Sequence, residues 1–143
     1  MEADKKKKKG TEVITFTVPL ALKEVKEDLT INTNNLSQKS KEQIINQAIN
    51  FQLQGNISEA TKYYKSCINK GFQDYRVFSN YGSILQSVSK LKDAELYLRK
   101  AIELNSNIAE VHYNLGNVLK DLSKFKDAEV STRKAIELKP NFA

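Results

Sequence analysis

Small and large apolar side chains recur along residues 41–142 with a period of 34 residues. Residues 75–108 match residues 109–142 at about half of all positions without a gap, and LKDAELYLRKAIELN returns as FKDAEVSTRKAIELK. Residues 41–74 keep the size and polarity of the side chains at lower identity. A fixed period of this length is the signature of stacked structural repeats. The sequence therefore predicts three units, 41–74, 75–108 and 109–142.

Within each unit the apolar positions fall at helical spacing in two runs of about 14 residues, which predicts a helix, a tight turn and a second helix. The predicted helices are 41–54, 57–70, 75–88, 91–104, 109–122 and 125–138. Two short helices stabilise each other only by close packing, so small side chains are needed where they cross. Small residues do recur at equivalent positions of the units: Ala48, Gly82 and Gly116; Ala60, Ala94 and Ala128; Cys67, Ala101 and Ala135. The predicted fold is all-α.

Boundary residues agree with this layout. Gly55 lies between the helices of the first unit, and Pro140 follows the predicted end of the last helix. Asn56 with Glu59, and Asn107 with Glu110, have the spacing of capping boxes at helix N-termini.

These residues resemble the tetratricopeptide repeat. The third unit carries the likeness in Asn114-Leu115-Gly116-Asn117, Phe125, Ala128, Ala135 and Pro140, and the other two units repeat it in weaker form. Gln47 departs from the family pattern, which prefers Leu there, as do Thr132, Phe72 and Ser106. The resemblance implies an α-solenoid, a right-handed superhelix of three helical hairpins. The first helix of each hairpin lines a concave groove that binds an extended peptide or a partner helix.

The resemblance also places candidate binding residues on the concave face. Asn46, Asn80 and Asn114 occupy the same position of the three units, similar to the asparagine ladder in the superhelical repeats of O-linked N-acetylglucosamine transferases. A carboxamide both donates and accepts hydrogen bonds, so this column can bind a peptide backbone, although it is also compatible with solvated groove residues. The neighbouring candidates are Arg76, Ser79, Ser83, Tyr113 and Asn117.

Another mode of this family, the carboxylate clamp for chaperone tails, is not expected. It needs Lys and Asn where the first unit has Ile45 and Ile49. It also needs basic residues where the third unit has Glu110 and Asn114.

The composition offers few residues that could catalyse a reaction or bind a metal. With one cysteine, Cys67, and one histidine, His112, no zinc cluster can be assembled, and His112 sits at a repeat position normally filled by a packing residue, which argues against a Ser-His-Asp triad. Both residues are interpreted as packing residues of the repeats. We expect no catalytic residue, metal or cofactor, no small-molecule substrate, and a reducing, cytoplasmic setting. The predicted function is a non-enzymatic protein-interaction module or scaffold.

Residues 1–40 lie outside the repeats and are predicted to form a basic, largely disordered arm. The formal net charge of the chain is +6, and residues 1–10, with five lysines against Glu2 and Asp4, contribute half of it. We expect nucleic-acid or membrane binding, if any, only through this run: Lys5, Lys6, Lys7, Lys8 and Lys9. Alternating Ile14, Phe16 and Val18 are strand-like, whereas residues 21–28 are helical and charged. We expect this stretch to be disordered or to be a weak docking peptide for the chain's own groove or that of a neighbour.

The predicted outer helix of the third unit has no polar helix after it to cover it, as solenoid ends normally need. Two alternatives stay open. The chain self-associates through this end, or it is the front of a longer architecture. In the second case it is the recognition arm of a transferase, for example a glycosyltransferase, sulfotransferase or methyltransferase.

Overall fold

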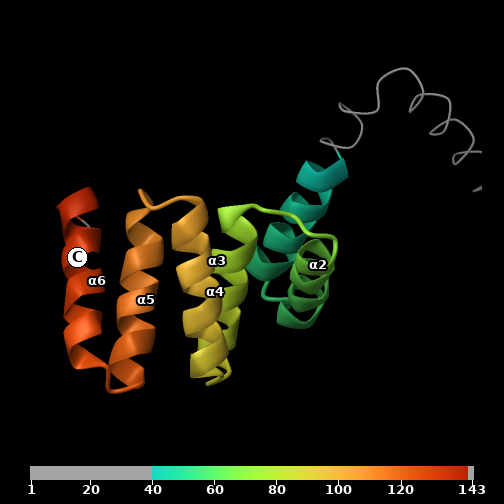
Figure 1. Ribbon diagram of the computed structural model, residues 1–143. Coiled ribbons are helices and arrows are strands. Elements are labelled where there is room, and N and C mark those ends of the chain that lie inside the picture. The colour runs from blue at the N-terminus through green and yellow to red at the C-terminus, as the bar shows by residue number, and fades with distance from the viewer. Residues whose placement is uncertain (1–39, 142–143) are drawn as a thin grey trace, which may run out of the picture. The chain divides into compact units, whose positions relative to one another are not determined.

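The computed structural model describes residues 40–141, all of whose regular elements are helices (Figure 1). A helix over residues 40–53 is followed by α2 (Ile57–Asn69), α3 (Tyr75–Ser87), α4 (Leu91–Leu104), α5 (Ala109–Asp121) and α6 (Phe125–Leu138). The predicted helices are confirmed, with each boundary shifted by at most one residue. The predictions for the basic arm and its strand-like stretch lie outside the described residues.

Residues 43–141 belong to one packed unit in which neighbouring helices run side by side. The most extensive contacts are within the hairpins, α3 with α4 and α5 with α6. Successive hairpins are joined by contacts of α2 with α3 and of α4 with α5, and α3 also touches α5. This arrangement is the predicted all-α solenoid of helical hairpins.

Small residues occupy the crossings between paired helices, as predicted. Ala48, Ala60, Cys67, Ala94, Ala101 and Ala135 are fully buried, and Ala128 nearly so. A Cβ added to Gly82 would lie 2.9 Å from Leu98 Cγ and 3.4 Å from the Ala94 carbonyl oxygen. The helices therefore approach so closely at Gly82 that no side chain fits without displacing a neighbour.

The turn inside each hairpin has the same backbone form in all three units. Gly55, Ser89 and Ser123 have φ values of 80°, 64° and 63°, in the left-handed region. The next N–H closes a six-residue loop onto the helix, as from Lys90 N to Leu85 O at 2.9 Å and from Lys124 N to Leu119 O at 2.8 Å. These are the bonds of a Schellman motif, which ends a helix by using its last carbonyls.

The two predicted helix caps have different outcomes. Asn56 caps α2, because its side chain accepts a hydrogen bond from Glu59 N at 3.3 Å. The Asn107 cap is wrong, since Ile108 is the N-cap of α5 and makes no side-chain cap. The Asn105 side chain accepts from Asn107 N at 3.1 Å, which forms a local turn just before the helix.

An ion-pair network around a partly buried carboxylate connects the second and third units. Glu95 on α4, with a side chain only 12% exposed, accepts from Arg99 Nε at 2.9 Å and from Lys124 Nζ at 2.9 Å. Lys124 precedes α6, so the pair with Glu95 spans two hairpins. Burial raises the pKa of Glu95, but the hydrogen bonds and charges of Lys124 and Arg99 outweigh it and leave the pKa lowered.

A matched pair of glycine substitutions tests the close crossing. In Gly82→Ala the new Cβ meets the fully buried Leu98, so we expect overpacking of ~1–3 kcal/mol to outweigh a gain in helix propensity of ~1 kcal/mol. In Gly116→Ala the new Cβ meets Thr132 Oγ1, and Thr132 is half-exposed beside an open groove, where it can change rotamer. Urea unfolding should show Gly82→Ala destabilised and Gly116→Ala unchanged or stabilised. Equal stability of the two variants would contradict this account of the crossing.

The Glu95 network predicts a pH-dependent contribution to stability. Because the folded-state pKa of Glu95 is lowered, its contribution is present above the unfolded value of about 4.3 and is lost as pH falls through the folded value. We expect Glu95→Gln to lower the free energy of unfolding at neutral pH by about 1 kcal/mol. The difference from the parent chain should shrink as pH falls below about 4. The control is Glu129→Gln at the equivalent position, where the carboxylate pairs only with Arg133 and is 64% exposed, so little change is expected. Equal effects of the two substitutions, or an effect of Glu95→Gln that persists in acid, would refute the prediction.

Candidate binding surfaces

The three candidate asparagines lie on the first helices of successive hairpins but differ in exposure. Asn46 on the 40–53 helix is exposed, whereas Asn80 on α3 and Asn114 on α5 are half-buried. The half-buried pair contacts the unit before it. Asn114 Nδ2 donates to Ser83 Oγ on α3 at 3.2 Å, so this carboxamide connects two hairpins.

Asn80 lies beside the first hairpin. Its side chain is near the Tyr64 hydroxyl, which donates a hydrogen bond to Gln52 Oε1 at 2.6 Å. Burial raises the pKa of Tyr64 to about 12, although the neighbouring Asn80 side chain lowers it. Tyr64 therefore stays a neutral donor at physiological pH.

The serine and arginine candidates are largely engaged within α3. Ser79 is buried and donates to Arg76 O at 3.4 Å, and Ser83 donates to Ser79 O at 3.1 Å. Arg76 binds the Asp74 carboxylate through Nε at 3.0 Å and through a terminal nitrogen at 2.8 Å. The hydrogen bonds and charge of Arg76 hold the pKa of Asp74 below its ordinary value despite its partial burial. The two charges compensate each other, which leaves this part of the surface close to neutral.

Tyr113 and Asn117 lie at a different place from Asn46. They line an open groove of about 620 Å³ between α5 and α6, whereas Asn46 lines a groove of about 500 Å³ along the 40–53 helix. The structure therefore divides the predicted binding set. Asn46 lines one groove, and Tyr113 and Asn117 line another. Ser83 and Asn114 are joined by a hydrogen bond across hairpins, and Asn80 lies near Tyr64 of the first hairpin.

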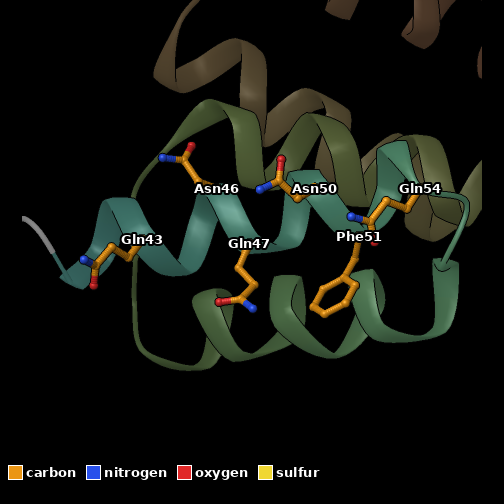
Figure 2. A pocket seen from close by; sticks show the side chains of 6 residues that line it. All are labelled: Gln43, Asn46, Gln47, Asn50, Phe51 and Gln54. Atoms are coloured by element: carbon orange, nitrogen blue, oxygen red, sulfur yellow. The ribbon is translucent and has the colours of Figure 1, made fainter.

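The groove at Asn46 is lined almost entirely by carboxamides from one helix (Figure 2). Figure 2 shows Asn46 and Asn50 on one side of that helix, and Gln47 and Phe51 turned toward α2. The Phe51 ring packs on Tyr63, with ring centroids 5.4 Å apart. The sequence interpretation missed the other polar members of this groove, which are Gln43, Gln47, Asn50 and Gln54. It treated Gln47 only as a departure from the family pattern. The sequence nevertheless shows that Gln43, Gln47, Asn50 and Gln54 are four, three and four residues apart, which is the spacing of one helix face.

His112 and Cys67 are packing residues, as predicted. His112 is 8% exposed, and its Nε2 lies 2.9 Å from Ser106 O, which ties α5 to the preceding turn. Cys67 is fully buried, and burial raises the pKa of its thiol. Over residues 40–141 no cluster of acidic, histidine and cysteine side chains could hold a metal ion. None of the helices in the same range has the length and apolar character that a membrane span requires.

Comparison with known proteins identifies the repeats. Family models described as tetratricopeptide repeat match residues 75–108 and 109–142, the same ranges as the predicted second and third units. No curated protein matches the chain.

Among solved structures, the chain is similar to a Thermobaculum terrenum O-GlcNAc transferase K341M mutant (22% identity, TM-score 0.69, 73% of this chain and 20% of that one). It is also similar to MamA (22% identity, TM-score 0.67, 87% and 70%). A third similar structure is the second TPR of Spaghetti (RPAP3) bound to the HSP90 peptide SRMEEVD (20% identity, TM-score 0.65, 72% and 98%). The chain thus spans about a fifth of the length of the transferase that it resembles. The matched repeats and the shared helical architecture show that this chain is a tetratricopeptide-repeat protein.

Proposed function

We propose that this protein is a binding module that holds an extended segment of a partner protein along the face marked by Asn46, Asn80 and Asn114. The observation that carries the proposal is the recurrence of one carboxamide on three successive hairpins. One of these side chains, Asn114, is held in place by the neighbouring hairpin through Ser83. A carboxamide held in this way loses little conformational entropy when it binds.

The local chemistry favours a neutral, backbone-directed mode of recognition. Asn114 uses one N–H on Ser83 and retains a second N–H and its carbonyl oxygen for a ligand. Arg76 is compensated by Asp74, so it adds little net charge for an acidic peptide. The amide groups of an extended peptide supply the matching donors and acceptors with little dependence on side-chain identity.

A chaperone-tail ligand of the kind bound by Spaghetti is not proposed. The positions where a carboxylate clamp needs Lys and Asn hold Ile45 and Ile49. Ile45 is 2% exposed and Ile49 is half-buried against the core, so neither offers a polar group to a terminal carboxylate. This module binds without catalysing a reaction.

A second candidate function is the recognition arm of a larger transferase. It is favoured by the likeness to the repeat-containing transferase of Thermobaculum terrenum, of which this chain spans about a fifth. The binding face described above would then select the polypeptide on which a separate catalytic domain acts. Sequencing the gene beyond the codon for residue 143 and finding a transferase domain in frame would support this candidate.

The peptide-binding proposal is tested with a peptide selected from a random display library against residues 1–143. Asn46→Ala combined with Asn114→Ala removes two carboxamides that each contribute about 1 kcal/mol, so affinity by calorimetry should fall roughly 30-fold. The matched control is Asn69→Ala, an exposed asparagine at the end of α2. It should leave affinity unchanged, and unfolding curves of each variant separate lost binding from lost structure.

The peptide itself provides the second arm of this experiment. N-methylation of alternate backbone amides should weaken binding, whereas replacing the same side chains with alanine should change it little. Full affinity of the double asparagine variant, or dependence on side chains alone, would refute backbone capture by the asparagine column.

A further inference from the structure

A small pocket lies where the first and second hairpins meet, and it shares no residue with the asparagine column. Its volume is about 170 Å³, and it is lined by Lys65, Ile68 and Asn69 of α2, Tyr81 of α3 and Tyr97 of α4. Pockets for small molecules are larger, roughly 300–1,000 Å³. A pocket of this size therefore accommodates one functional group, such as the end of a single side chain.

The two tyrosines of this pocket lie against each other and bring two hydroxyl groups to it. Their ring centroids are 5.1 Å apart. Tyr81 is only 7% exposed, and over residues 40–141 neither its hydroxyl nor that of Tyr97 makes a hydrogen bond. Burial raises the pKa of Tyr81, and the neighbouring Tyr97 and Asp93 raise it further, so it is a neutral O–H donor. A buried donor without a partner is costly, which indicates that this pocket favours a hydrogen-bond acceptor.

The equivalent junction one repeat later is closed by different side chains. Leu115 and Ser131 take the places of Tyr81 and Tyr97, and they are 2% and 8% exposed. The contact of α4 with α5 is also more extensive than that of α2 with α3. The second junction is thus filled by small and aliphatic side chains, whereas the first is open beside two hydroxyls.

The cation at the edge of the pocket lacks the partner that its repeat equivalents have. Lys65 corresponds to Arg99 of the second unit, which pairs with Glu95 one helical turn earlier at 2.9 Å. The third unit repeats this pair. In the first unit Thr61 stands in place of the glutamate, and Lys65 makes no ion pair with the residues that the structure describes. The first unit therefore has the cation of this pair without its carboxylate.

We propose that this pocket binds the carboxylate of one aspartate or glutamate side chain of a partner protein. Lys65 supplies the positive charge, and Tyr81 and Tyr97 supply two O–H donors. The incoming carboxylate pairs with Lys65 as Glu95 pairs with Arg99. Hydrogen bonds to a charged acceptor are shorter and stronger than those between neutral groups, so one side chain is an effective anchor.

The charges around the pocket favour a carboxylate over a phosphate group. Asp93 lies one helical turn before Tyr97 on α4, and its charge contributes to the raised pKa of Tyr81. It opposes the charge of Lys65, so the surroundings of the pocket are close to neutral. A second negative charge on the ligand gains little attraction there and costs additional dehydration.

NMR titration of the full chain with blocked amino acids tests this choice of ligand. N-acetylglutamate N-methylamide carries one carboxylate, and it should shift the amide resonances around Lys65 and Tyr97 in a saturable manner. N-acetylglutamine N-methylamide has the same shape without the charge and should bind roughly tenfold more weakly. Inorganic phosphate at the same ionic strength should also bind more weakly. Equal or tighter binding of the glutamine derivative or of phosphate would overturn the carboxylate assignment.

Restoring the glutamate of the other units provides a matched pair of variants. Thr61→Glu should pair with Lys65 and thereby lower the affinity for the glutamate derivative roughly tenfold. Thr61→Gln has nearly the same shape without the charge and should leave the affinity nearly unchanged. The second unit carries Glu95 at this position, so the fold accepts a side chain of this size, and urea unfolding of both variants checks it.

Tyrosine variants test the hydroxyl donors separately from the charge. Tyr81→Phe removes only the hydroxyl and should weaken binding of the glutamate derivative about tenfold. The matched control is Tyr75→Phe on the same helix, because Tyr75 does not line the pocket, and its affinity should equal that of the parent chain. Undiminished affinity in either Tyr81→Phe or Thr61→Glu would overturn the proposed site.

Discussion

The close crossing of paired helices at small residues is the constraint on which the rest of this structure depends. Ala48, Gly82 and Gly116 lie on the first helices, and their partners on the second helices are also small. At Gly82 the contact is so tight that a single methyl group would collide with Leu98. Because every hairpin crosses at the same position, each presents the same faces at the same angle to its neighbours.

Because of this regularity, residues at equivalent positions of the repeats lie above one another on the same side of successive hairpins. A residue placed on the groove side of one hairpin recurs on the groove side of the next, as Asn80 and Asn114 do. The hydrogen bond from Asn114 to Ser83 then orients a side chain of the proposed binding face and also joins two hairpins. Stacking is reinforced on another side by Lys124 and Glu95. Binding face and scaffold are therefore not separable parts of this molecule.

Much of the helical layout could be predicted from sequence because the period itself carries the information. Every helix boundary followed within one residue, and the positions of buried small residues followed from their recurrence. The cap at Asn107 failed because Ile108 is the N-cap of α5, and the Asn107 N–H that a capping box would direct to Glu110 is donated to the Asn105 side chain. Spacing alone cannot rank two such local hydrogen bonds.

The candidate site was less predictable, because exposure depends on the adjacent hairpin. Ser79 has groove spacing but is buried, and Asn80 meets the Tyr64 hydroxyl from a hairpin that precedes it. The row of carboxamides on the first hairpin was visible in the sequence. Its exposure became clear only by comparison with the equivalent apolar residues of α3 and α5, most of which the structure shows to be buried. The family pattern does not determine the contacts between side chains of different units, and these contacts decide which groove residues are exposed.

The charges distinguish three regions of the chain, each of which would favour a different kind of partner. Along the asparagine column the local charges compensate each other, as Arg76 and Asp74 do, so attraction there comes from hydrogen bonds that salt screens little. The lysine run at residues 5–9 is the opposite case, since its attraction to anions falls steeply with ionic strength. At the α5–α6 groove the exposed surface is apolar, and contacts there strengthen rather than weaken with excluded salts such as sulfate. The ionic-strength response of any observed association therefore indicates which of the three surfaces carries it, before a single residue is changed.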